Sequence, residues 1–179
     1  AGDLLGSAVA LSGDTLVVGA PRHDDSANNS GSCYVFVRAG TVWSQQAKVN
    51  AADPAAGDSL GRSLSLSGDR FVAGAFQKDD DGIDSGSAYV FTRAGTAWSQ
   101  EAKLIADDGA AGDELGGGVA LSNDTAVIGA PYADVGTNTN QGAAYVFRRS
   151  GSTWIQEAKL VATDSAAQSA FGTGGALLN

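Results

Sequence analysis

The same nine-residue segment occurs three times in this chain. It reads GDTLVVGAP at 13–21, GDRFVAGAF at 68–76 and NDTAVIGAP at 123–131. Tryptophans repeat with the same spacing, at Trp43, Trp98 and Trp154, which are 55 and then 56 residues apart. A period near this length, sustained three times, is typical of stacked or radial folds built from one supersecondary unit per repeat.

Alignment on the tryptophans divides the chain into repeat units. They are 1–55, 56–110 and 111–166, followed by 167–179, which matches only the opening of a unit. Each unit contains four short segments in which large and small residues alternate with period two, the signature of a β-strand. In the first unit these segments are 6–13, 15–20, 32–38 and 42–49. No segment combines helix caps with a 3.6-residue period, so we expect no substantial helix.

The predicted fold is therefore all-β, with four-stranded antiparallel β-propeller blades at about 6–51, 61–106 and 116–162 and the first strand of a fourth blade. Together these units are expected to form one partial propeller domain. Pro21 and Pro131 should end the second strand of their blades, since proline withholds an N–H. Gly19 and its equivalents Gly74 and Gly129 should stand where the backbone turns or approaches a neighbour closely.

Two short motifs recur at a fixed spacing in these units. Leu-Gly at 5–6, 60–61 and 115–116, and Phe-Gly at 171–172, come about 13 residues before GAP at 19–21 and 129–131 or GAF at 74–76. The pair resembles the FG-GAP repeat, which builds the β-propeller of integrin α-subunits and of many bacterial secreted or surface proteins. The bacterial variety is the closer match. The resemblance implies an extracellular or cell-surface location, and a first strand that lines the central channel.

Composition excludes several classes of function. The formal net charge of −9 argues against binding a nucleic-acid backbone, and no apolar run is long enough to span a membrane. With Cys33 as the only cysteine and His23 as the only histidine, neither an intrachain disulfide nor a usual zinc site can form. Cys33 aligns with Ala88 and Ala144, so we expect it to be a small residue packed in a strand.

Calcium-binding members of the resembled family carry an acidic loop between strands one and two. The corresponding segments here are only SGDT, SGDR and SNDT, so that calcium function is not expected at Asp14, Asp69 or Asp124. Each of these carboxylates is expected to bond the backbone of its own turn.

The loops between strands two and three are richer in oxygen ligands. One of them contains Asp79, Asp81 and Asp84, which are the candidate metal ligands, although their spacing departs from a calcium loop. The prediction for cofactors is therefore none, with calcium at this loop as the alternative. Candidate binding residues in the same loops are His23, Asp24, Asp25, Asn28, Asp80, Asp134, Asn138 and Asn140.

Three interpretations of function remain open. The first is a non-enzymatic extracellular module for protein or glycan binding, adhesion or self-assembly, with no catalytic residues. The alternatives are a propeller-based secreted hydrolase or lyase, and a fragment of a larger propeller protein. Three blades leave two faces uncovered, so self-association into a ring or filament is expected, with Phe171, Leu177 and Leu178 as candidate contact residues.

Overall fold

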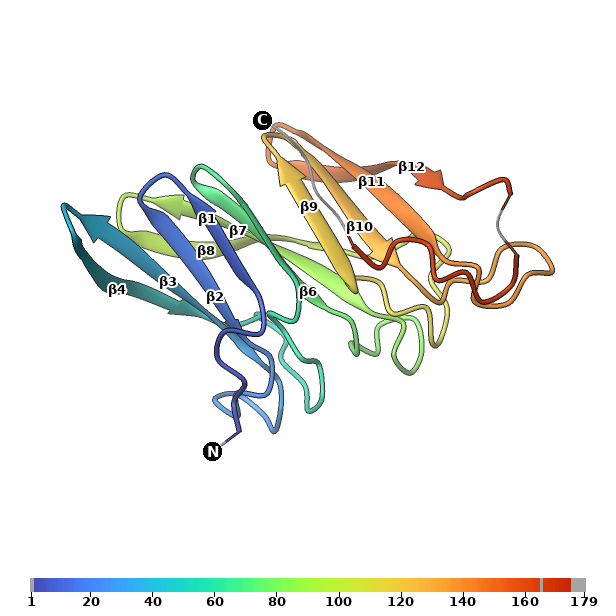
Figure 1. Cartoon of the computed structure of the whole chain (residues 1–179), viewed down its shortest axis with the longest axis horizontal. Helices are drawn as coiled ribbons and strands as arrows, with labels where there is room; N and C mark the ends of the chain where they lie inside the picture. Colours follow the sequence, from blue (N-terminus) through green and yellow to red (C-terminus); the bar gives the residue numbers. More distant parts are fainter. Residues whose placement is uncertain (1, 165, 175–179) are drawn as a thin grey trace.

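The computed structural model describes residues 2–164 and 166–174, which form three four-stranded antiparallel sheets and, in this range, no helix. Each sheet is one blade, and the chain passes through its strands in order (Figure 1). The strands of blade 1 are β1 (Val9–Ser12), β2 (Thr15–Ala20), β3 (Ser32–Ala39) and β4 (Val42–Val49). Those of blade 2 are β5 (Leu64–Ser67), β6 (Arg70–Ala75), β7 (Ser87–Ala94) and β8 (Ala97–Leu104). Those of blade 3 are β9 (Gly118–Ser122), β10 (Thr125–Ala130), β11 (Ala143–Ser150) and β12 (Thr153–Leu160). The predicted all-β blade architecture is confirmed.

The repeated markers occupy equivalent places in the three sheets. Each tryptophan pairs with an arginine on the neighbouring strand: Trp43 with Arg38, Trp98 with Arg93 and Trp154 with Arg149. The first strand of blade 1 is shorter than the sequence suggests, because Gly6 has a positive φ of 94° and its N–H bonds the carbonyl oxygen of Gly19. The strand therefore begins at Val9.

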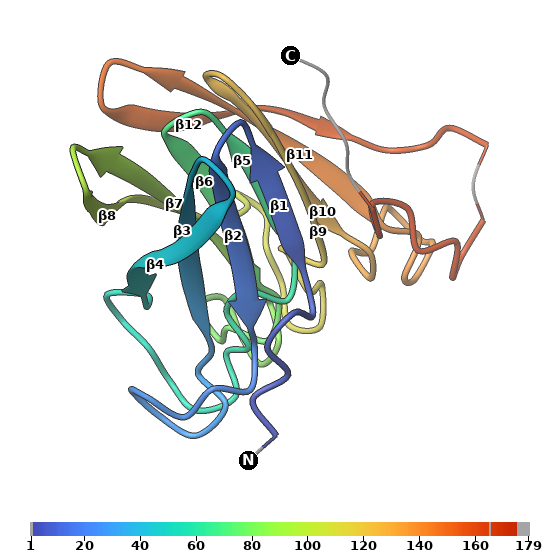
Figure 2. The ribbon, with the colours of Figure 1, turned by 60° about the vertical axis from the view of Figure 1, so that its left-hand side comes forward.

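The blades fan out so that their first strands lie next to one another. β1 contacts β5 and β5 contacts β9, whereas β4, β8 and β12 form the outer edges (Figures 1 and 2). The backbones come closest at the two recurring glycines. A Cβ atom at Gly19 would overlap the carbonyl oxygen of Gly61 in the next blade, and one at Gly74 would overlap that of Gly116. The nine-residue segment recurs because each copy forms this second strand and its close approach to the next repeat.

The core consists of two clusters, each between a pair of adjacent blades. Blade 2 directs Leu66, Phe71 and Phe91 into the cluster shared with blade 1, and Val72 and Val90 into the cluster shared with blade 3. Period-two alternation thus buries both faces of this sheet. Cys33 is fully buried in the first cluster, as predicted, and burial raises the pKa of its thiol.

Polar contacts also join the blades. The Trp98 indole donates to Gln46 Oε1 at 2.9 Å, and Gln100 Oε1 accepts the backbone N–H of Ala52 at 2.9 Å. Glu101 lies between Arg70 of its own blade and Arg149 of blade 3 (2.6 and 2.5 Å). Burial raises the pKa of Glu101, but hydrogen bonds from the two guanidinium groups outweigh that effect and leave the pKa below its ordinary value of 4.5.

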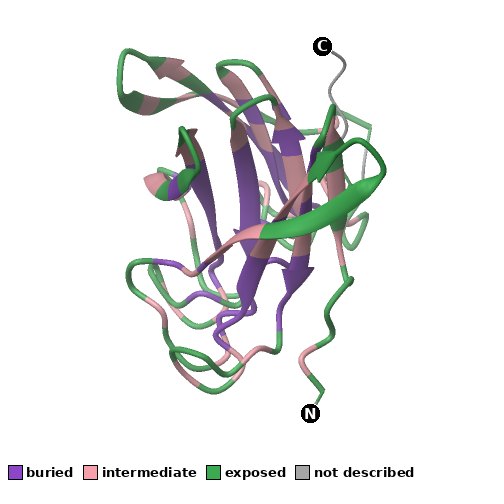
Figure 3. Cartoon of the chain, turned by 90° about the vertical axis from the view of Figure 1, so that its left-hand side faces the viewer, coloured by how far each residue is buried: buried purple, intermediate pink, exposed green. Residues whose placement is uncertain are grey.

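The two terminal blades each keep one uncovered face. Leu11 and Trp43 of blade 1 are 63% and 40% exposed, whereas their equivalents in blade 2, Leu66 and Trp98, are 8% and 9% exposed. On blade 3 Leu160 is 45% exposed. Figure 3, which looks at blade 1, shows a largely exposed outer strand with buried strands behind it.

The described part of the fourth unit is held by the same chain. Phe171 forms a parallel bridge with Gly142, as Leu60 does with Gly31 and Leu115 with Gly86. Its backbone is bonded within the chain at Phe171, whose N–H donates to the Gln141 carbonyl oxygen at 3.0 Å, and self-association through Phe171 stays a prediction. Leu177 and Leu178 lie outside the described residues.

Candidate functional site

The variable loops lie together at one end of the blades. The loops between the second and third strands of each blade (β2–β3, β6–β7 and β10–β11) emerge at the lower end in Figure 1, with the connections that lead from one blade to the next. The tight hairpins between first and second and between third and fourth strands occupy the opposite end. We call the lower end the loop face. A rigid repeated scaffold that presents differing loops on one face is the usual setting of a binding site.

One aspartate in each of the β2–β3, β6–β7 and β10–β11 loops holds the backbone of that loop, and we call this contact the clamp. Asp24 Oδ1 accepts the backbone N–H of Asn29, and the same 2.8 Å bond joins Asp79 to Asp84 and Asp134 to Asn140. The donor residue has a positive φ of 53–55° in all three loops. Since non-glycine residues rarely adopt this conformation, the clamp stabilises a strained turn.

Other predicted binding residues also have partners inside the protein. His23 Nδ1 accepts the backbone N–H of Asp25 at 3.2 Å, and the Asp25 carboxylate pairs with Lys48 at 2.6 Å. Asp80 bonds Ser87 and Lys103. Asn138 donates to Gln141 Oε1 at 2.9 Å, and the Asn28 carbonyl oxygen accepts the N–H of Gly57 at 2.9 Å.

The three candidate metal ligands do not converge. In the described ranges 2–164 and 166–174, no group of three or more His, Cys, Asp or Glu side chains is placed to hold a metal ion. Asp79 is engaged by the N–H of Asp84, and Asp81 is exposed. Calcium at this loop stays a prediction, and titration calorimetry of the wild type and Asp81→Ala tests it, because only a site in this loop would lose its heat of binding.

The hairpin aspartates differ from expectation. The Asp14 carboxylate pairs with Arg38 at 2.6 Å, Asp69 pairs with Arg93, and Asp124 lies 3.4 Å from Arg149. The prediction that these carboxylates bond their own turn backbone is wrong, because the turn places each of them beside the arginine at the end of the third strand.

A buried ion pair stabilises the connection between blades 1 and 2. Asp58 Oδ2 accepts the N–H of Ala55 at 2.6 Å and lies 3.1 Å from Lys78 Nζ, with both side chains at most 10% exposed. Its equivalent in the next connection, Asp113, accepts the N–H of Ala110 at 3.0 Å, and burial raises the pKa of Asp113. Both aspartates thus stabilise the connection that leads from their blade to the next.

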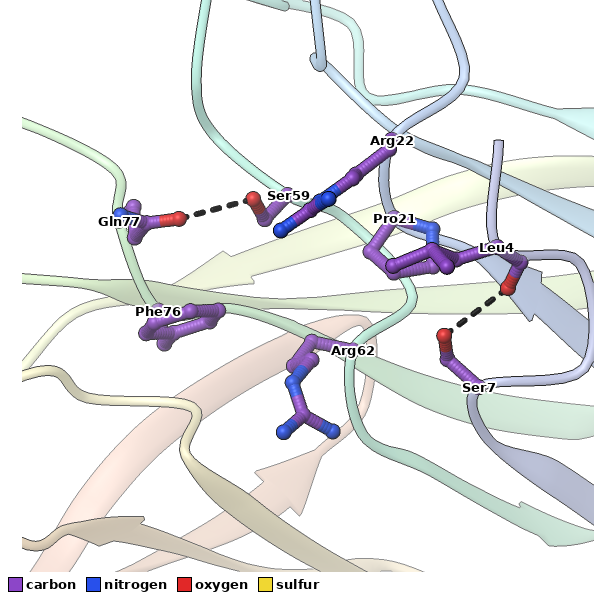
Figure 4. A pocket seen from close by; sticks show the side chains of 8 residues that line it. All are labelled: Leu4, Ser7, Pro21, Arg22, Ser59, Arg62, Phe76 and Gln77. Carbon is purple, nitrogen blue, oxygen red and sulfur yellow. Dashed lines mark hydrogen bonds between the residues drawn. The ribbon is translucent and has the colours of Figure 1, made fainter. Parts of the chain in front are cut away.

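Two pockets open on the loop face, on either side of a shared wall. The first has a volume of about 320 Å³ and is shown in Figure 4; it is lined by Leu4, Ser7, Pro21, Arg22, Ser59, Arg62, Phe76 and Gln77. The second, of about 280 Å³, is lined by Arg62, Phe76, Glu114, Gly117, Pro131, Tyr132 and Thr173. We call the two pockets together the inner furrow.

Sequence reasoning missed the inner furrow. Neither Arg62 nor Arg22 is among the candidate residues chosen from the sequence. The available signal was the difference between repeats, because Arg22 aligns with Gln77 and Tyr132, whereas the residue before it ends the same GAP or GAF motif.

Burial raises the pKa of Glu114, and the nearby Asp84 carboxylate adds to the rise. A carboxyl group in such surroundings keeps its proton to a higher pH than an exposed glutamate.

None of the described segments is a helix with the length and apolarity of a membrane span.

Comparisons with known proteins bear on the family and the fold. The family model described as the FG-GAP repeat matches residues 1–36, 43–91 and 98–147. The solved structures include a match to Sqt1 from Saccharomyces cerevisiae, a propeller-like protein, with a TM-score of 0.58 and 11% sequence identity over 90% of this chain. The match covers 37% of the Sqt1 chain. A search of curated proteins gives no match. At this identity the likeness to Sqt1 supports the fold alone.

Proposed function

The chain belongs to the FG-GAP repeat family, and from this premise we propose that it is a non-enzymatic binding module, located outside the cell or at the cell surface, with a protein or glycan as its ligand. FG-GAP repeats are typical of extracellular and surface proteins. Adhesion or assembly at the surface is the role we propose for this binding.

One observation carries the proposal: three loops of different sequence stand side by side on a scaffold whose strands repeat almost unchanged. The aspartate clamp in each loop fixes its backbone before any ligand arrives. A pre-organised surface loses less conformational entropy on binding, so this arrangement favours recognition.

A glycan and protein array, followed by titration of each ligand found, tests the proposal. A variant with Asn28, Asp81 and Thr137 changed to alanine alters exposed loop-face residues outside the clamps. A control variant with Thr41, Thr96 and Ser152 changed to alanine alters exposed residues of the β3–β4, β7–β8 and β11–β12 hairpins at the opposite end. Binding should fall in the first variant and persist in the second. Equal binding by both variants would refute a site on the three variable loops.

A secreted hydrolase or lyase is the second candidate, and one observation favours it. Glu114 lines the second pocket beside Tyr132, and its raised pKa suits a general acid. Glycoside hydrolysis usually needs two carboxyl groups flanking the substrate, however, and this pocket is lined by one. Turnover of a glycoside or ester that is lost in Glu114→Gln would establish the enzyme and overturn the non-enzymatic proposal.

The proposed partner for the uncovered blade faces is a second copy of the chain. The free face of blade 1 carries Leu11 and Trp43, the equivalents of residues that pack against a preceding blade. The free face of blade 3 carries Val146 and Leu160, the equivalents of Val90 and Leu104, which pack against a following blade. The two faces therefore match in a head-to-tail contact, which closes into a ring or extends into a filament.

Light scattering tests this partner. Leu11→Lys and Leu160→Lys each place a charge on one free face, and Ile83→Lys, at a loop residue that is 73% exposed, is the matched control. We expect the wild type and Ile83→Lys to associate at micromolar concentration and the two face variants to stay monomeric. A monomeric wild type would refute self-association and favour a longer chain whose further blades cover both faces.

A further inference from the structure

Two cations differ from all the others in this acidic protein. Of its eleven lysines and arginines, nine form an ion pair with a carboxylate. The exceptions are Arg22 and Arg62, whose guanidinium groups have no hydrogen bond or ion pair with any residue in the ranges 2–164 and 166–174. Both line the first pocket of the inner furrow.

The lack of an ion pair at both Arg22 and Arg62 is informative because the protein has many carboxylates. The chain has twenty Asp and Glu residues, and they satisfy every other cation it carries. A guanidinium group offers five N–H donors in a planar fork that matches a carboxylate. Two unpaired guanidinium groups on one pocket therefore form a local positive site in a protein of net charge −9.

The rest of the pocket is amphipathic. Phe76 and Pro21 supply an apolar wall, and Figure 4 shows the Arg22 side chain extending toward Ser59, whereas the Arg62 side chain points away from Ser59. Ser59 Oγ lies 3.0 Å from Gln77 Oε1, and Ser7 Oγ donates to the Leu4 carbonyl oxygen at 2.9 Å. The Gln77 side-chain amide keeps its N–H donors available to a bound molecule.

We propose that the inner furrow binds an acidic glycan, with carboxylates of its uronic acid units held by Arg22 and by Arg62 and the apolar face of a sugar ring against Phe76. The proposal rests on the proposed binding function and names the ligand class of the loop face. Hydroxyl groups of the same sugar would meet Ser7 and Gln77.

The shape of the furrow favours a glycan over an acidic peptide. The first pocket, at about 320 Å³, exceeds what one Asp or Glu side chain fills, and the second pocket continues from it across Arg62 and Phe76. Tyr132 there is 43% exposed and offers a second aromatic surface. Successive pockets with aromatic walls suit successive sugar rings.

Charge differs between the two pockets. Glu114 places a carboxyl group in the second pocket, whereas the lining of the first contains no acidic residue. An acidic sugar is therefore favoured in the first pocket and a neutral sugar in the second. Replacing Glu114 by glutamine should strengthen binding of a glycan that is acidic throughout, because it removes a like charge.

Titration calorimetry with a galacturonic acid tetrasaccharide at physiological salt tests the proposal. Arg22→Ala and Arg62→Ala should each weaken binding about tenfold or more, the loss expected for one charge-assisted hydrogen bond. Arg38→Ala removes the same charge at the opposite end of blade 1 and should bind as the wild type does. The methyl-esterified tetrasaccharide should bind weakly to every variant.

Three results would overturn the assignment. They are no binding of the tetrasaccharide by a folded wild type, binding that survives in Arg22→Ala and Arg62→Ala, and a glutamate tetrapeptide that binds more tightly than the sugar. If an array ligand depends on Asn28, Asp81 and Thr137 but not on the two arginines, the binding module stands and the furrow proposal fails.

Discussion

Leucine stands at the same place on the first strand of all three blades, at Leu11, Leu66 and Leu121, and its burial differs because of neighbouring blades alone. Leu66 and Leu121 are 8% and 3% exposed, and both belong to clusters between blades. Leu11 is 63% exposed because no blade covers its face. Replacing each leucine by alanine thus measures the contribution of blade packing at constant chemistry.

The magnitudes follow from these exposures. A Leu→Ala change in a packed core lowers the free energy of unfolding by about 2–5 kcal/mol, because it loses both the transfer energy and the cavity contacts. We expect that loss for Leu66→Ala and Leu121→Ala. At Leu11 only about a third of the side chain leaves water and no cavity forms, so the loss should be about 0.5–1 kcal/mol.

Urea denaturation followed by tryptophan fluorescence provides the measurement. It should be made at protein concentrations where light scattering shows a monomer, since association would cover Leu11. An equal loss for Leu11→Ala and Leu66→Ala in the monomer would refute the view that stability resides between blades. A loss at Leu11 that grows with protein concentration would instead support the head-to-tail contact.

Three further predictions concern the backbone and the buried charges. Gly74→Ala should lower the urea midpoint steeply, because its Cβ would overlap the Gly116 carbonyl oxygen, whereas Gly174→Ala, with nothing within 4 Å of its Cβ, should leave the midpoint unchanged. The lowered pKa of Glu101 means that its contribution to stability is complete above its ordinary pKa of 4.5 and is lost as the pH falls through the lower folded value. Glu101→Gln should therefore be less stable at neutral pH, and its stability should fall less steeply below pH 4.5. Asp58→Ala should cost up to about 3–5 kcal/mol in urea denaturation, because it removes the nearest carboxylate from the buried Lys78, which keeps only the Asp53 carbonyl oxygen at 2.8 Å and the Asp53 carboxylate at 4.0 Å. Asp113→Ala should cost less, since Ala133 stands where Lys78 does, and equal losses would contradict this account.

The fold could be predicted from the sequence because its causes are local and repeated. Alternating residues specify the strands, and Gly13 and Gly68 supply the positive φ that their hairpins need. The partners of the charged side chains could not be predicted from local pattern. Asp14 pairs with Arg38, which is 24 residues away, and that pairing depends on how two hairpins align rather than on local pattern.

Because contacts between distant residues cannot be predicted from local pattern, the sequence indicated only part of the candidate site. Polar loops pointed to the end of the blades at which the inner furrow opens, but most of the residues chosen from them, such as Asp24 and Asp134, are engaged by their own loops. A carboxylate close in sequence to a strained turn is readily used by that turn. The residues that the fold leaves unpaired, Arg22 and Arg62, carry no such local signature.

In a repeat protein, however, the units of one chain can be aligned with one another, and positions that are the same in every unit can be told from positions that vary. The glycine of each Leu-Gly or Phe-Gly motif has a positive φ between 90° and 96°, a conformation that favours glycine, which explains why it is retained in every unit. The residues directly after them in the furrow are free to vary: Arg62 aligns with Ser7, Gly117 and Thr173. Since the backbone at these positions is fixed by the glycines, each blade can place a different side chain at the same spatial position. Charge at one position of the furrow then costs the fold little, which is the condition under which a binding site can arise on a repeated scaffold.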